Sequence, residues 1–133
     1  MLKEHEKEII KNEKIFILLG LLTFFLTACQ DSTMNFTDIY PHIHVTKIEV
    51  TKGNGENTII TNQTHIDEWI NRMQSITFAL EEKQEKKVGY LYSVKMYNKD
   101  EEVGSFTTSE INGHYYKENT ELVAAIEDLI NKK

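Results

Sequence analysis

The stretch VGYLYSVKMY, residues 88–97, decides the fold, because apolar side chains recur in it at every second position. This period of two is typical of a β-strand with one buried face. A polar turn, Asn98-Lys99-Asp100, follows it, and residues 102–108 can return as the antiparallel partner. An antiparallel hairpin is therefore the predicted centre of the protein. The face expected to be buried consists of Val88, Tyr90, Tyr92, Val94 and Met96.

The residues after this hairpin predict a second hairpin and a closing helix. Asn112-Gly113 is a strong two-residue turn signal, and it joins Glu110-Ile111 to residues 114–116. Asn119 or Thr120 can cap a helix that follows. Its apolar residues recur at helical spacing, and they are Leu122, Val123, Ile126, Leu129 and Ile130.

Two strands are predicted upstream. Residues 43–51, IHVTKIEVT, are rich in β-branched side chains, although their apolar phase slips near Thr46-Lys47, where we expect a bulge. Gly53-Asn54-Gly55 supplies turn residues, and residues 58–61 can return as the second strand.

A helix and a further strand lie between these parts. Thr64 can act as the N-cap of a helix that buries Trp69, and residues 76–80 predict a strand. The predicted fold class is α+β, with an antiparallel sheet of about five to six strands and two helices on one face. The predicted order is β-β-α-β-β-β-β-α, in a single domain over residues 42–133.

Composition limits the function classes. The chain has 133 residues, of which 40% are hydrophobic and 27% charged, and its formal net charge is −6. An acidic balance argues against nucleic acid as a partner, since phosphate binding requires basic patches. Cys29 is the only cysteine, so an internal disulfide is excluded.

Residues 15–26, IFILLGLLTFFL, form an apolar run without a charge. A helix of about twelve residues covers ~18 Å, which is short of the ~30 Å hydrocarbon core of a bilayer. The length fits the hydrophobic region of a secretion signal, and Thr27 and Ala28 supply the small residues of a cleavage site. The alternative is a buried core helix with an incidental cysteine, but such a helix should show polar periodicity.

Leu26-Thr27-Ala28-Cys29 resembles the lipobox of bacterial lipoproteins, an aliphatic residue and two small residues before an invariant cysteine. The resemblance implies a diacylglyceryl thioether on Cys29, with fatty acyl chains such as palmitate, and signal peptidase cleavage between Ala28 and Cys29. It implies that residues 1–28 are removed as a lipoprotein signal peptide. The protein would then be exported and lipid-anchored at the outer face of the cell membrane. One feature departs from the pattern, because four lysines before the apolar run are balanced by four glutamates.

Residues 30–41, QDSTMNFTDIYP, show neither a helical nor a strand period. We therefore expect residues 29–41 to be the lipidated cysteine and a flexible tether that ends at Pro41. Twelve extended residues at ~3.3–3.6 Å each would hold the domain up to ~40 Å from the membrane.

Metal ligands are sparse. His42 and His44 lie two apart on the predicted strand and so would point to one side. Zinc would require a third ligand, such as Asp38 or His114. Because histidines at the start of an edge strand are more often polar surface, His42 and His44 are only weak candidates, and no metal is expected.

Catalytic groups are not evident either. No nucleophile elbow surrounds Ser93, Ser105 or Ser109. No catalytic residue is assigned, and no cofactor is expected beyond the covalent diacylglyceryl group on Cys29.

The tyrosines offer two interpretations. Tyr90 and Tyr92 share the phase of Val94, so we expect them in the core beneath the helices. On an open sheet face they would instead suit protein recognition. Tyr97, on the opposite face with Leu91, is the better candidate for an exposed aromatic contact.

The stretch YLYSVKMYNKDEEVGSFTTSEINGHYYK, residues 90–117, is similar to a pattern in small uncharacterised lipoproteins of Gram-positive bacteria. The resemblance implies the hairpin pairing and the class, and it carries no activity. We expect the mature domain to be a protein-interaction module with an unidentified protein partner, such as an inhibitor, an immunity protein or an envelope accessory protein. A small-ligand or metal-binding lipoprotein is the alternative, and an enzyme is not expected.

Overall fold

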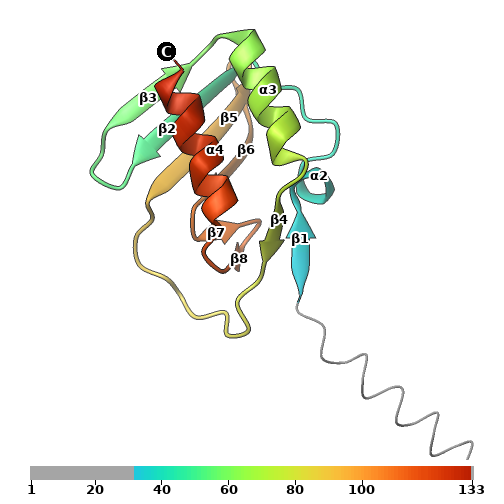
Figure 1. The fold of residues 1–133 in the computed structure, drawn as a ribbon, viewed down its shortest axis with the longest axis vertical. Coiled ribbons are helices and arrows are strands. Elements are labelled where there is room, and N and C mark those ends of the chain that lie inside the picture. The colour runs from blue at the N-terminus through green and yellow to red at the C-terminus, as the bar shows by residue number, and fades with distance from the viewer. Residues whose placement is uncertain (1–31, 133) are drawn as a thin grey trace, which may run out of the picture. The chain divides into compact units, whose positions relative to one another are not determined.

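The predicted central hairpin is present as two long strands, β5 and β6, in a computed structural model that describes residues 32–132 (Figure 1). β2 and β3 extend the sheet beside β5, and the short strands β7 and β8 extend it beyond β6, giving the antiparallel order β3-β2-β5-β6-β7-β8. The elements are β1 (Thr33–Asn35), α2 (Phe36–Ile39), β2 (Lys47–Lys52), β3 (Asn57–Ile60), α3 (Gln63–Met73), β4 (Thr77–Ala79), β5 (Tyr92–Asn98), β6 (Glu101–Thr107), β7 (Glu110–Ile111), β8 (His114–Tyr115) and α4 (Thr120–Asn131).

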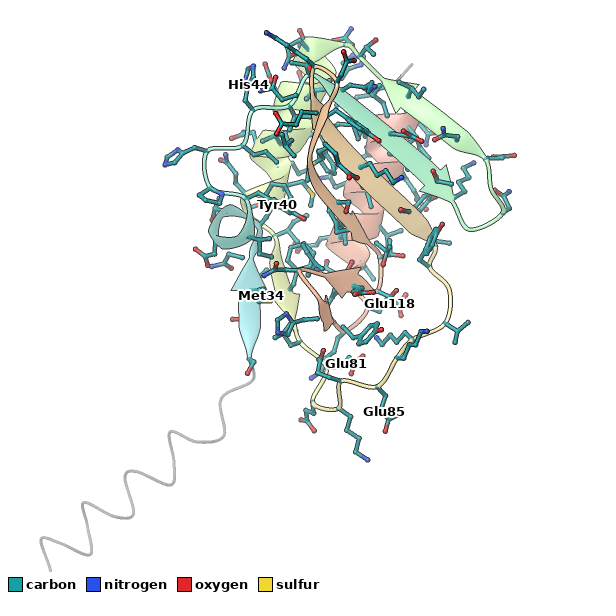
Figure 2. All side chains as sticks on the ribbon, turned by 180° about the vertical axis from the view of Figure 1, so that it is seen from behind. Met34, Tyr40, His44, Glu81, Glu85 and Glu118 are labelled. Carbon is teal, nitrogen blue, oxygen red and sulfur yellow. The ribbon has the colours of Figure 1, made fainter. Side chains whose placement is uncertain are left out.

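Two helices, α3 and α4, lie side by side over one face of this sheet and leave the opposite face open (Figures 1 and 2). The predicted α+β class, the antiparallel sheet and the two covering helices are confirmed. From β2 onward the order of elements also agrees with the predicted order, except that the last predicted strand is present as two short strands, β7 and β8. Within residues 32–132, no helix is long and apolar enough to cross a membrane.

The buried face of β5 follows the predicted alternation over only part of its length. Tyr92, Val94 and Met96 are buried, but Tyr90 is 43% exposed and the strand starts after it. The extended run is interrupted at Gly89, whose φ of 83° is left-handed. The prediction of a core position is therefore confirmed for Tyr92 and wrong for Tyr90.

The tight turns and helix caps follow local chemistry. Asn112 and Gly113 both have positive φ, 49° and 77°, as a two-residue hairpin of the predicted kind requires. The Asn119 side chain accepts a hydrogen bond from the Leu122 backbone N–H at 3.1 Å, which confirms it as a cap of α4. The cap of α3 is Asn62 rather than Thr64.

The predicted tether is wrong for residues 33–40, because they belong to the fold. β1 pairs with β4, and Phe36 is only 1% exposed. Its ring lies 6.4 Å from that of Trp69 and 6.3 Å from that of Phe106, measured between centroids. A three-residue strand and a four-residue helix are too short to produce a periodic pattern, so this segment gave no signal. Residues 29–31 of the predicted tether lie outside the described residues.

The predicted strand over residues 43–51 is also shorter than expected. β2 starts at Lys47, and the segment before it contains His42 with a positive φ of 53°. The bulge expected near Thr46-Lys47 is therefore absent, because β2 begins at Lys47. The register shift of the sheet lies instead between Met96 and Tyr97 on β5.

The strand predicted over residues 76–80 is present as β4, but it joins a separate two-stranded sheet with β1. A single bridge between Leu80 and Tyr116 connects this small sheet to the main one. The pairing continues on both sides of the bridge, from Glu81 N–H to the Tyr115 carbonyl at 3.0 Å and from Lys117 N–H to the Ala79 carbonyl at 2.7 Å. The start of the described chain is thereby fixed against β4, beside the last hairpin.

Candidate functional site

The open face of the sheet carries a groove of about 540 Å³ over β5 and β6, which we call the open-face groove. Because Tyr92, Val94 and Met96 face the helices, the alternate residues of β5 face the groove. The groove is lined by Tyr40, Ser93, Lys95, Ser105, Phe106, Thr107, Glu110, Asn112 and Gly113.

Polar side chains dominate the floor and one side of the open-face groove. Lys95 on β5 pairs directly with Ser105 on β6, and both are exposed. The Thr107 hydroxyl accepts hydrogen bonds from the backbone N–H of Ser109 at 3.2 Å and of Glu110 at 3.0 Å. Thr107 thus fixes the turn that carries Glu110 to the groove. A lysine ammonium and a glutamate carboxylate are then available on one surface.

Tyr40 forms the aromatic edge of the groove. Its hydroxyl donates a hydrogen bond to the Ser105 carbonyl at 2.9 Å, and burial raises the pKa of this phenol, so it remains a donor. The ring can approach β6 only because residue 104 is glycine. A Cβ there would lie 2.6 Å from Tyr40 Cε1 and 2.8 Å from Met96 Cε.

Tyr97 continues the open face beside the groove, but it is half-buried rather than freely exposed. The Lys47 ammonium lies 4.4 Å from its ring centroid, which is a cation–π distance. Its hydroxyl lies 3.5 Å from a carboxylate oxygen of Glu49, and Glu49 is the cross-strand neighbour of Lys95. Charged and aromatic groups therefore alternate across this face.

The histidine candidates are not brought together with further ligands. His42 and His44 are exposed and precede β2, so they do not share one side of a strand. His114 is on β8, with Nδ1 2.9 Å from the Asn112 carbonyl oxygen. Among residues 32–132 there is no group of three or more histidine, cysteine, aspartate or glutamate side chains placed to hold a metal.

Two of the three serines considered as nucleophiles, Ser93 and Ser105, do line the open-face groove. The third, Ser109, donates its hydroxyl to the Gly89 carbonyl at 3.2 Å. The groove residues, all from the described part of the chain, include no histidine or cysteine. This arrangement can bind a ligand through hydrogen bonds and charge, but it gives the serines no imidazole base.

Sequence reasoning did not assign Lys95, Glu110 or Asn112 to a site. The alternation of β5 does place Lys95 on the side opposite the buried face, so its position on the open face could have been predicted from the sequence. The β7–β8 hairpin contributes Glu110, Asn112 and Gly113 to the groove. How this hairpin lies against the sheet depends on tertiary contacts, for which the sequence has no local pattern. The predicted lipid-attachment and cleavage residues, Cys29 and Ala28, lie outside the described residues.

Comparison of the chain with protein-family models, with curated proteins and with solved structures finds no match.

Proposed function

We propose that this chain is a lipoprotein, anchored to the outer face of the cell membrane through Cys29, whose folded domain binds a protein partner. The anchor is supported by the apolar run over residues 15–26 and by the lipobox-like Leu26-Thr27-Ala28-Cys29. Cleavage before Cys29 would remove no residue of the described fold, which starts at Ser32. Two acyl chains at ~0.8 kcal/mol per buried methylene make a stable anchor, whereas one chain is marginal.

The observation that carries the binding role is the open-face groove on the helix-free side of the sheet. Its side chains offer donors and acceptors, with Lys95 and Asn112 beside Glu110, and Tyr40 at the edge. No polar or charged residue in residues 32–132 is buried, so the polar groups of the groove lie at the surface. Non-obligate protein interfaces are about as polar as the rest of a protein surface and contain many direct and water-mediated hydrogen bonds. Small-molecule sites instead enclose most of the ligand around a few converging polar groups.

Photocrosslinking in intact cells tests this role. A benzophenone amino acid in place of Lys95 should give a defined adduct with one envelope or extracellular protein. The matched control replaces Glu121, an exposed residue of α4 on the helical side. Equal adducts from both positions, or none from position 95, would refute binding at the open-face groove. A bound small molecule recovered with the purified protein would favour the small-ligand alternative.

A further inference from the structure

The proposed lipid attachment site lies close to the folded domain along the chain. β1 starts at Thr33, four residues after Cys29, so the predicted twelve-residue tether is reduced to a few residues. An extended chain covers at most ~3.3–3.6 Å per residue, which places the Cα of Thr33 within ~14 Å of that of Cys29. The headgroup region of a bilayer adds ~5–8 Å on each side of the hydrocarbon core. If Cys29 is lipidated, the β1 end of the domain must lie at the membrane surface.

The 81–91 loop begins at this same end of the domain. The Leu80 N–H donates to the Ser32 carbonyl at 2.9 Å, so the loop begins beside the first described residue. Figure 2 shows the labelled Glu81 and Glu85 at the end where β1 begins, and His44 at the opposite end. The second half of the loop then leaves this end and rises along the side of the molecule to the start of β5 (Figure 1).

Side-chain hydrogen bonds hold the first half of the 81–91 loop against β8. The Gln84 amide bonds the Tyr115 backbone twice, as donor to the carbonyl at 2.9 Å and as acceptor from the N–H at 2.8 Å. The Lys87 ammonium bonds Glu81 Oε1 at 2.8 Å and the Tyr116 carbonyl at 2.9 Å. These contacts fix the position from which the next residues project.

The second half of the loop projects apolar side chains into solvent. Val88 is 97% exposed and Leu91 is 55% exposed, and with Tyr90 they account for three of the four large exposed apolar residues in residues 32–132. Residues 81–91 carry three lysines and three glutamates, so this loop has no net charge, whereas the whole chain has a formal net charge of −6. Exposed apolar groups among lysines suit the boundary between headgroups and acyl chains.

We propose that the 81–91 loop docks on the lipid surface of the membrane, with Val88 and Leu91 in contact with lipid. This inference rests on the proposed lipidation of Cys29. The turn at residues 98–100 joins β5 to β6 at the end of the hairpin far from the loop, so docking through the loop would leave this turn away from the membrane.

A fluorescent probe on the full lipoprotein tests the docking. The Cys29 sulfur is consumed in the thioether, so Glu85→Cys introduces the only free thiol for an environment-sensitive label, and Asp100→Cys provides the matched control. Both proteins are reconstituted in vesicles of phosphatidylcholine and phosphatidylglycerol, with or without nitroxide-labelled lipid. The label at position 85 should emit at shorter wavelength and be quenched by the nitroxide, whereas the label at position 100 should do neither. Val88→Asp with Leu91→Asp should abolish the quenching at position 85.

The outcomes separate the two claims. Equal quenching at positions 85 and 100 would overturn the docking, as would quenching at position 85 that survives the double substitution. Protein that floats with the vesicles but fails these tests would retain the lipid anchor and lose only the docking. Protein that does not float would overturn both. Since Val88 and Leu91 contribute little to the core, circular dichroism should show the double variant folded.

Discussion

The side-chain amide of Gln84 pairs with the backbone of Tyr115 as a neighbouring strand would, accepting at 2.8 Å and donating at 2.9 Å. The Gln84 side chain thus bonds both the N–H and the carbonyl of Tyr115 in β8. The same carbonyl also accepts a hydrogen bond from the Glu81 N–H, next to the bridge to β4. The same pairing, together with the hydrogen bonds of Lys87, holds the 81–91 loop against β8.

Removing the Gln84 amide should loosen the loop without unfolding the domain. Gln84→Ala loses the two hydrogen bonds to Tyr115 and a third to the Glu81 carbonyl, at a cost of roughly 1 kcal/mol each at most, because all three are exposed to water. Hydrogen exchange at the Tyr115 amide should accelerate, and exchange in α3 should not change. Gln84→Glu is the matched control, since it keeps the acceptor for the Tyr115 N–H. Unchanged exchange at Tyr115 in Gln84→Ala would contradict the pairing.

The place of Phe36 in the core gives a second prediction. Because its ring is buried among aromatic neighbours, Phe36→Ala should lower the free energy of unfolding by about 3–5 kcal/mol. Thr37→Ala, one residue away and exposed, should change it by less than about 0.5 kcal/mol. Urea titration of the soluble chain from residue 30 measures both. If residues 30–41 were a flexible tether, Phe36→Ala and Thr37→Ala would have the same free energy of unfolding. That result would contradict the buried position of Phe36.

The contact between Gly104 and Tyr40 predicts coupling between the groove edge and β6. Gly104→Ala should cost about 1–3 kcal/mol, because the new Cβ would overlap the Tyr40 ring and the Met96 methyl group. In the Tyr40→Ala background the same substitution should cost less, since one of the two clashing groups is gone. A double-mutant cycle by chemical denaturation measures the difference. Additive effects would show that the ring does not occupy this position.

The contacts of Phe36 and Gly104 also show which parts of the structure could be predicted from the sequence. Strict alternation over Tyr92, Val94 and Met96 predicted the central strand, and Asn112-Gly113 predicted its hairpin, because both signals are local. Phe36 packs against Trp69 and Phe106, which are 33 and 70 residues away along the chain, and Gly104 meets Tyr40, 64 residues away. No local pattern encodes such contacts. The open-face groove was missed for the same reason, since it forms where the last hairpin curls over β6.

The buried Tyr116 phenol predicts alkaline destabilisation. Burial raises the pKa of Tyr116, and its hydroxyl donates to the Thr107 carbonyl, so the folded state retains a proton that the unfolded chain releases above about pH 10. The contribution is fully present below pH 10 and declines as pH rises through the folded-state pKa. The free energy of unfolding should therefore fall above pH 10, by up to ~1.4 kcal/mol per pH unit from this group.

Tyr116→Phe isolates that contribution. The variant should be less stable at pH 7, because it loses the hydrogen bond to Thr107, and its stability should fall less steeply between pH 10 and 11.5. Guanidinium titrations of both proteins across this range give the comparison, and other titrating groups cancel in the difference. Parallel slopes for the two proteins would rule out Tyr116 as a source of the pH dependence.

The anchor is the claim on which the cellular role and the membrane docking both depend. The most direct test is the intact mass of the chain extracted from membranes of a bacterium that processes lipoproteins, beside Cys29→Ala as control. We predict a chain that starts at Cys29 and is heavier than residues 29–133 by a diacylglyceryl group, while the Cys29→Ala protein is uncut or released from the membrane. A membrane-bound chain that still carries residues 1–28, or that starts at Cys29 without added lipid, would contradict the account.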